Sequence, residues 1–241
     1  MMPPLKAVAD AHRRLLEVTA PLTDEQVRTP SLLPGWSRAH VLAHLTDNAR
    51  AFARVSALAL RGELVDAYEG GRAERDAIIE GLAAGNAHSH RDGLTRHLTA
   101  LEAVWSQASP ADWELPVRYR NGDLAEVVRM RWREVWIHLV DLDLGVSPEE
   151  WTDDFCHHTI EFLLPRLPDG VALRQTDGPA RWSPDGEISA VRDVEIAGPA
   201  RDLAAWLTGR PTHRLTASEL PELEPWPAHP EPAPDRSRAA G

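Results

Sequence analysis

Apolar residues recur at helical spacing over most of the first 143 residues of the chain. The pattern predicts helices over residues 3–20, 37–61, 72–84, 88–107 and 123–143. Ser37 is the expected N-cap of the second of them, because its hydroxyl can accept a hydrogen bond from a free backbone N–H of the first turn. Thr23 and Gln26 fit a capping box that begins a short turn of helix. Four of the predicted helices are long enough to pack as a four-helix bundle.

The pattern changes after residue 145. Ser147 and Pro148 fit the start of a further helix, and the apolar positions continue it to about residue 164. Three short stretches then read as half-buried strands, over residues 171–176, 181–182 and 191–196. Residues that suit hairpin turns lie between them: Gly178, Pro184 and Gly186. An amphipathic helix follows and ends at Gly209.

These elements predict an α+β protein of two domains. We expect residues 1–146 to form the helical bundle and residues 147–218 to form a smaller α/β domain. Residues 219–241 are rich in proline and acidic residues and can bury little apolar surface. We therefore expect an extended or disordered tail, in which Trp226 is the side chain that can dock on the folded part.

Composition limits the classes of partner. The formal net charge of -11 argues against nucleic acid and anionic membranes, because both favour clustered Lys and Arg. A single cysteine, Cys156, excludes an intrachain disulfide framework. The N-terminus lacks the apolar core of a signal peptide, and no run approaches the roughly 18 apolar residues of a membrane span. We expect a cytoplasmic monomer with no membrane partner, in which a local arginine can still bind an anionic substrate.

Four polar residues interrupt the apolar pattern of the helix over residues 123–143. Arg131, Glu134, His138 and Asp141 follow one another at intervals of three, four and three residues, which places them on one side of the helix. Glu134 and His138 are about one turn apart, so a single metal ion can contact both. On its own, such a pair more commonly faces solvent, or its histidine packs in the core with a hydrogen-bond partner. Carboxylates and imidazoles are costly to bury without a partner.

A second helix offers the partner that changes this interpretation. His44 lies at the edge of the apolar stripe of the helix over residues 37–61, whereas His40 falls in its first turn near solvent. With Glu134 and His138, His44 completes a set of two histidines and one carboxylate that leaves a coordination position open. Such an open set is typical of catalytic rather than structural metal sites.

The other polar candidates carry simpler interpretations. We expect His12 to be packed, and His88, His90 and His97 to face solvent. Adjacent residues on a helix point about 100° apart, so Cys156 and the two histidines after it cannot share one ion. Asp47 and Asp141 each follow a candidate ligand by one turn and either orient its imidazole or face solvent. Arg131 either neutralises Glu134 or an acidic substrate, or forms a plain ion pair.

Two motifs carry a resemblance to a known family. The run GWSRAHVLAHL, residues 35–45, is followed about ninety residues later by REVWIHLVDL, residues 133–142. In this order the pair resembles the mycothiol-dependent maleylpyruvate isomerases, which belong to the DinB-like metal-binding four-helix bundles. The resemblance covers most of the chain. It implies zinc held by His44, Glu134 and His138, and mycothiol as the thiol cosubstrate.

The resemblance also extends to the second domain, whose last helix is followed by Gly209 and Arg210. It implies that Arg210 contributes to activity. A lone arginine after a helix C-terminus is also an ordinary capping choice, because it interacts favourably with the last carbonyl groups. Both interpretations of Arg210 stay open at this point.

The resemblance implies isomerisation of maleylpyruvate to fumarylpyruvate by addition of a thiolate, bond rotation and elimination. The thiol has to be external, because the chain has no cysteine at the motif. Three alternatives remain. The same site can serve a mycothiol S-transferase that acts on other electrophiles; the bundle can be a binding module with a vestigial site; or the two histidines and carboxylate can hold iron(II) in an oxygenase.

Overall fold

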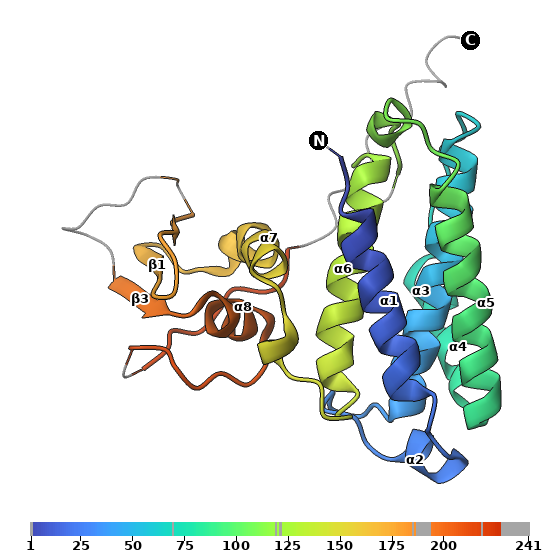
Figure 1. Cartoon of the computed structure of the whole chain (residues 1–241), viewed down its shortest axis with the longest axis horizontal. Helices are drawn as coiled ribbons and strands as arrows, with labels where there is room; N and C mark the ends of the chain where they lie inside the picture. Colours follow the sequence, from blue (N-terminus) through green and yellow to red (C-terminus); the bar gives the residue numbers. More distant parts are fainter. Residues whose placement is uncertain are drawn as a thin grey trace. The chain divides into compact units, whose positions relative to one another are not determined.

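A computed structural model of the chain describes residues 2–68, 70–118, 120, 122–184, 186, 194–217 and 219–227. The chain divides between Leu144 and Gly145 into two compact units. The first unit is helical and the second contains a three-stranded sheet with helices, so the predicted α+β class is confirmed (Figure 1). Among the described residues, no helix has the length and apolar character needed to cross a membrane.

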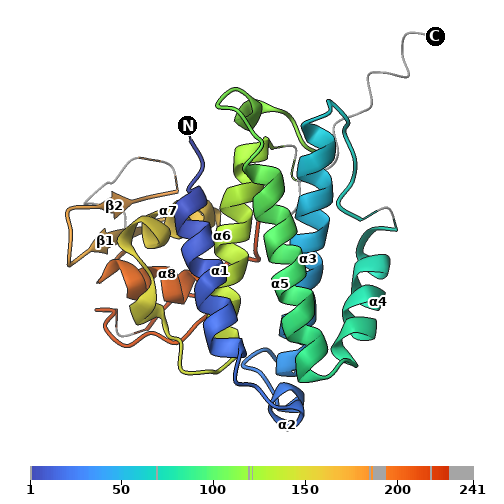
Figure 2. The same ribbon diagram turned by 45° about the vertical axis from the view of Figure 1, so that its right-hand side comes forward.

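The first unit is built on the predicted four-helix bundle. Its helices are α1 (Leu5–Thr19), α2 (Asp24–Arg28), α3 (Arg38–Ala59), α4 (Gly71–Ala83), α5 (Ala87–Trp105) and α6 (Leu124–Asp141). Helices α1 and α3 each pack against both α5 and α6, which closes the four into a ring, and α4 lies outside the ring against α3 (Figure 2). The core is made of buried apolar side chains from all four helices: Leu15, Leu45, Phe52, Leu94, Leu101, Leu124 and Leu139.

Caps set where the two central helices begin. The hydroxyl of Ser37 accepts a hydrogen bond from the backbone N–H of His40, and Nδ1 of His40 accepts one from the backbone N–H of Ser37. Oδ1 of Asp123 accepts a hydrogen bond of 2.7 Å from the backbone N–H of Glu126 at the start of α6. Because these caps satisfy N–H groups that have no partner within the helix, they fix which residues face the core in the turns that follow.

The start of α3 is tied to the end of α6. Nε of Arg38 donates to the carbonyl oxygen of Leu142 at 2.7 Å, and the backbone N–H of Leu32 donates to the carbonyl oxygen of Asp141 at 2.9 Å. The two helices are therefore antiparallel neighbours at this end. As a result, a residue two turns into α3 faces a residue in the last turn of α6.

The second unit has a sheet with helices beside it. Its elements are a 3-10 turn (Pro148–Glu150), α7 (Asp153–Leu163), a second 3-10 turn (Leu164–Arg166), β1 (Val171–Gln175), β2 (Arg181–Trp182), β3 (Val194–Gly198) and α8 (Ala200–Thr208). The strand order is β2-β1-β3. Helix α8 ends as predicted at Gly209, whose φ of 75° is the left-handed conformation that glycine adopts readily.

The single helix predicted from Ser147 to about residue 164 is wrong, because the structure has two pieces. Ser147 caps only the 3-10 turn. Trp151 then leaves helical geometry, with φ -70° and ψ 132°, and its ring is fully buried. Thr152 caps α7 by accepting a hydrogen bond from the backbone N–H of Phe155 at 3.3 Å. Burying the large indole and capping a new helix together outweigh continuation of the first turn.

Hairpin turns account for only one of the two strand connections. Strands β1 and β2 are antiparallel neighbours, as a hairpin requires, but β3 runs parallel to β1, with Val171 opposite Val194. Parallel neighbours need a crossover connection, so the turn residues after β2 do not make a second hairpin. Strand β3 also continues two residues beyond the predicted end, to Gly198. Residues 191–193 of the predicted strand lie outside the described residues.

The described part of the tail contacts the second unit. The backbone N–H of Glu224 donates to the carbonyl oxygen of Arg166 at 2.9 Å, and the guanidinium of Arg166 lies 5.2 Å from the ring centroid of Trp226. A cation over an indole face is favourable. Trp226 is thus the docked side chain of the tail, although its exposed fraction is 42%. Residues 228–241 lie outside the described residues.

Candidate metal centre

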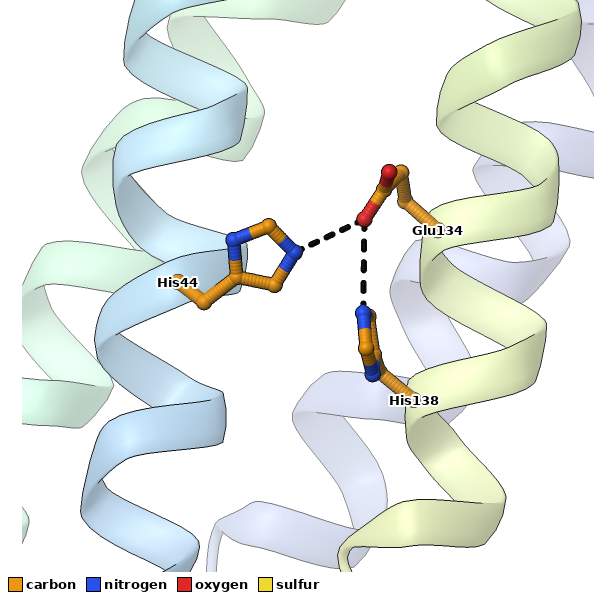
Figure 3. A group of neighbouring side chains, drawn as sticks. All are labelled: His44, Glu134 and His138. Carbon is orange, nitrogen blue, oxygen red and sulfur yellow. Dashed lines mark hydrogen bonds and ion pairs between the residues drawn. The ribbon is translucent and has the colours of Figure 1, made fainter. Parts of the chain in front are cut away.

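His44, Glu134 and His138 meet between α3 and α6 (Figure 3). Nε2 of His44 lies 2.8 Å from Oε2 of Glu134, and Nε2 of His138 lies 3.4 Å from the same oxygen. The two imidazole rings are 4.8 Å apart and nearly perpendicular, at 86°. Because α3 and α6 are antiparallel, a ligand near the start of one helix meets two ligands in the last turns of the other.

The site is mostly shielded from water. The exposed fractions of the side chains are 7% for His44, 16% for His138 and 29% for Glu134. Burial lowers the pKa of His44 below its usual 6.5. Burial works against ionisation of Glu134, but the two imidazoles outweigh it and hold the pKa of that carboxyl well below its usual range. The carboxylate is therefore charged and directed at both ring nitrogens.

The residues present fit a divalent metal ion. Two imidazole nitrogens and one carboxylate oxygen all lie within 4.8 Å of one another, which small side-chain rotations bring within reach of one ion. Oδ2 of Asp141 lies 2.7 Å from Nδ1 of His138, so this ring nitrogen carries the proton and Nε2 is free to bind a metal. Burial opposes protonation of His138, yet Asp141 and Glu134 together raise its pKa.

Asp47 does not take the corresponding position beside His44. In the described residues, its Oδ1 accepts a hydrogen bond of 2.7 Å from Nε of Arg50. Nδ1 of His44 instead faces Arg75 of α4, whose Nη2 lies 3.3 Å away. Arg75 was not among the site residues predicted from the sequence. The available signal is that Arg75 precedes Ile79, the buried apolar residue of α4, by four residues and so shares its face.

Trp36 is a second neighbour that was not predicted as a site residue, although it lies within the first motif, residues 35–45. Its ring is 5.9 Å from that of His44 and 6.1 Å from that of His40. The loop that carries Trp36 also lines a surface hollow of about 440 Å³. The indole is therefore an apolar wall beside the ligand on α3.

Arg131 lies deeper in the bundle and is fully buried. Its Nη1 donates to the carbonyl oxygen of Leu45 at 3.0 Å and to Oδ1 of Asn48 at 2.7 Å, and its Nε donates to Nε2 of His12 at 3.1 Å. Burial lowers its pKa to about 10, so the guanidinium is still charged near neutral pH. The contacts are therefore to neutral groups of α1 and α3, in place of the ion pair considered from the sequence.

His12 is packed, as predicted, and its two ring nitrogens have different partners. Nε2 accepts the hydrogen bond from Arg131, and Nδ1 donates to Oε1 of Glu102 at 2.7 Å. A protonated ring would place an N–H against a guanidinium N–H, which is unfavourable. This agrees with burial lowering the pKa of His12 to about 4.

This shift predicts a loss of stability in acid. The unfolded state binds a proton at His12 below its usual pKa of 6.5, whereas the folded state does so only near pH 4. Stability from this residue is therefore present above pH 6.5 and falls, by about 3 kcal/mol, as the pH drops towards 4. Urea unfolding of the wild type and His12→Gln at pH 7, 5.5 and 4 checks it. The stability difference between the two should shrink by that amount, and a constant difference contradicts the prediction.

The remaining histidines include one wrong prediction. His88 is exposed and pairs with Asp92 at 3.2 Å, as expected, and His97 is half-buried. His90, expected in solvent, has an exposed fraction of only 5%. It continues the buried stripe of α5 formed with Leu94 and Leu98, so helical packing decides its burial despite its polarity.

Within the described part of the chain, Cys156 and its neighbours are not among the residues whose spacing suits a metal ion. Among the described residues, the only group with metal-ligand spacing is the one on α3 and α6. Cys156 is buried, which raises the pKa of its thiol to about 12, and Nε2 of His157 lies 3.0 Å from Oε1 of Gln175. An inert, protonated thiol does not supply a metal ligand.

Arg210 follows α8 in the second unit. Its Nη1 donates to the carbonyl oxygen of Thr208, and its backbone N–H donates to that of Ala205 at 2.8 Å. The side chain thus caps the C-terminal end of the helix, which is the simpler of the two interpretations. A contribution of Arg210 to activity stays a prediction.

Comparison with known proteins gives a family and a fold. The sequence profile of the mycothiol maleylpyruvate isomerase N-terminal domain matches residues 8–143. The chain is similar to the crystal structure of the mycothiol-dependent maleylpyruvate isomerase, with a TM-score of 0.82, and to a histidine-to-alanine variant of it, with 0.81. Each is 22% identical, and 92% of this chain aligns with 95% of the other. No curated protein sequence matches the chain.

Proposed function

This chain belongs to the family of the mycothiol maleylpyruvate isomerase N-terminal domain, and from that membership we propose that it is a thiol-dependent isomerase. The proposed reaction converts maleylpyruvate to fumarylpyruvate with mycothiol as cosubstrate. The observation that carries the proposal is the open set of His44, Glu134 and His138, intact and convergent in a family named for this chemistry. We further propose that the resident metal is zinc and that the protein is a cytoplasmic monomer.

His44, Glu134 and His138 would hold the ion. A zinc ion there would act as a Lewis acid and favour the thiolate form of a bound thiol, whose free pKa is about 8.5. Asp141 keeps the proton of His138 on Nδ1 and so directs Nε2 to the site. The surrounding helices exclude water from the ligand side chains, which strengthens every electrostatic interaction in the site.

The proposed reaction conserves atoms and electrons without a redox partner. The thiolate adds to one carbon of the cis double bond, and the electron pair moves onto the adjacent carbonyl as an enolate. The former double bond is now single and rotates. Return of the electron pair expels the thiolate and leaves the alkene trans. Arg210 is proposed to bind a substrate carboxylate, because a guanidinium fork matches a carboxylate.

A single preparation tests the function. Metal content is measured on the purified protein, and maleylpyruvate isomerisation is followed with and without mycothiol, before and after removal of metal by a chelator. We expect one zinc per chain and turnover that needs both thiol and metal. Metal without turnover rejects the isomerase and favours the S-transferase, which an alkylating fluorophore that consumes mycothiol would reveal. Failure to bind zinc even when it is added contradicts both enzymes.

A further inference from the structure

Hydrogen bonds join α3 to α6 on both sides of the candidate metal centre. At the end of the bundle, Nε of Arg38 donates to the carbonyl oxygen of Leu142 at 2.7 Å. Inside the bundle, Nη1 of Arg131 donates to the carbonyl oxygen of Leu45 at 3.0 Å and to Oδ1 of Asn48 at 2.7 Å. Along each helix, the candidate ligands fall between these two connections.

Arg131 lies close to a candidate ligand on each of the two helices. It precedes Glu134 by three residues on α6, so both side chains lie on the face that meets α3. Its two acceptors on α3 belong to residues one and four positions after His44. A shift of one helix along the other would therefore break the hydrogen bonds of Arg131 and separate His44 from Glu134 at the same time.

Stability alone does not explain this buried guanidinium. Its hydrogen bonds go to neutral groups of His12, Leu45 and Asn48. Within the described part of the chain, its Nη2 has no hydrogen-bond partner. A buried charge costs free energy unless a counter-charge contacts it, and an apolar side chain of similar volume avoids that cost.

The electrostatic influence on Arg131 also comes from the candidate site. Burial lowers the pKa of Arg131, and the charge of Glu134 is the largest influence that opposes this shift. The guanidinium is thus coupled to a candidate ligand on its own helix and hydrogen-bonded to the helix that carries another. Hydrogen bonds fix the register of two helices more sharply than apolar contacts do, because they depend on direction as well as on distance.

We propose that Arg131 is a positioning residue of the candidate metal centre, which holds α3 in register with α6 so that His44 meets Glu134 and His138 at one point (Figure 3). Its role is indirect, through the backbone of α3 and the side chain of Asn48. The inference rests on the metal site of the proposed function, but it does not depend on the isomerase reaction.

Three variants separate positioning from general stability. Arg131→Met removes all the donors of the guanidinium, and Asn48→Ala is a milder change that removes one acceptor and keeps Arg131. Leu94→Ala is the control, because it leaves a cavity in the core at α5 and should lower stability without removing a hydrogen bond between α3 and α6. Urea unfolding establishes that each variant is folded and gives its loss of stability.

The first measurement is the zinc affinity of the folded proteins, by competition with a chromophoric chelator. We expect Arg131→Met to bind zinc roughly 10- to 100-fold more weakly than the wild type, as is usual when a group that orients a ligand is lost. Asn48→Ala should show a smaller loss, and Leu94→Ala should match the wild type. Removal of a positive charge by itself favours binding of a cation, so weaker binding in Arg131→Met has the sign that positioning predicts and that charge does not.

Unchanged or tighter zinc binding in folded Arg131→Met overturns the proposal, and Asn48→Ala decides in the same way if Arg131→Met does not fold. An equal loss of affinity in Leu94→Ala also overturns it, because zinc affinity would then follow general stability.

The second measurement is the visible absorption spectrum of the proteins loaded with cobalt(II), which reports the geometry around the ion. We expect the spectra of Arg131→Met and Asn48→Ala to differ from that of the wild type, and the spectrum of Leu94→Ala to match it. Identical spectra in all four proteins contradict the positioning role. Neither measurement uses thiol or turnover, so a protein that binds metal without isomerase activity would reject the proposed function and leave this test of Arg131 intact.

Discussion

Replacement of His44 by alanine is expected to leave the purified protein without bound metal and without thiol-dependent turnover. The side chain supplies one of three ligand atoms, and Nε2 lies 2.8 Å from the oxygen of Glu134 that faces the same position. Loss of a partner that only orients a ligand costs roughly 10- to 100-fold in metal affinity, and loss of the ligand itself should cost more. Elemental analysis and a zinc titration of the variant measure the effect.

His40→Ala is the matched control, because His40 lies one turn earlier on the same helix but its ring contributes to a helix cap and is not one of the candidate metal ligands. Its Nδ1 accepts the capping hydrogen bond from the backbone of Ser37, so its loss should reduce stability by about 1 kcal/mol and leave metal content unchanged. Metal retained at full stoichiometry in His44→Ala would show that α3 does not supply the ligand.

Arg131→Met is expected to lower the free energy of unfolding by about 2–6 kcal/mol, that is, about 1–3 kcal/mol for each of two buried acceptors that lose their donor. The methionine fills much of the volume but leaves Oδ1 of Asn48 and Nε2 of His12 buried without the donor they now have. Buried polar groups that lose their partner carry the full cost of removal from water. Urea unfolding at pH 7, above the usual histidine pKa of 6.5, measures the change.

Arg129→Met tests whether the effect comes from burial. Arg129 is on the same helix, is 21% exposed and pairs with Glu126 at 3.4 Å. Its loss should cost less than about 1 kcal/mol, as is usual for pairs near the surface. If Arg131→Met and Arg129→Met lose similar free energies of unfolding, the buried hydrogen bonds of Arg131 contribute little to stability.

The sequence alone predicted the features that depend on the spacing of residues within one element. The four long helices, the caps at Ser37 and Thr23, and the end of α8 at Gly209 all follow from rules that span a few residues. Convergence of His44 with Glu134 and His138 needed one further step, because it depends on two helices that are neighbours. The edge position of His44 on an apolar stripe supplied that step.

The predictions that failed concern features that depend on packing between segments far apart in the sequence. Arg75 reaches His44 only because α4 packs on α3 in one register, and the single buried residue Ile79 is a weak guide to that register. The helix after Ser147 breaks because the ring of Trp151 is buried. Strand β3 pairs in parallel with β1. This pairing depends on the path of the chain as a whole, and the nearby turn residues do not indicate it.

The side chains around the candidate metal centre come from two kinds of segment, and this has a consequence for protein engineering. The candidate ligands lie on α3 and α6, whose spacing is held by the core, whereas Trp36 lies on a loop and Arg75 lies on a helix outside the ring. The loop and the outer helix can be redesigned or exchanged while the frame of α3 and α6 stays intact. The chain is therefore a suitable starting scaffold for libraries that vary the surroundings of the candidate site at positions 33–36 and 71–83 alone.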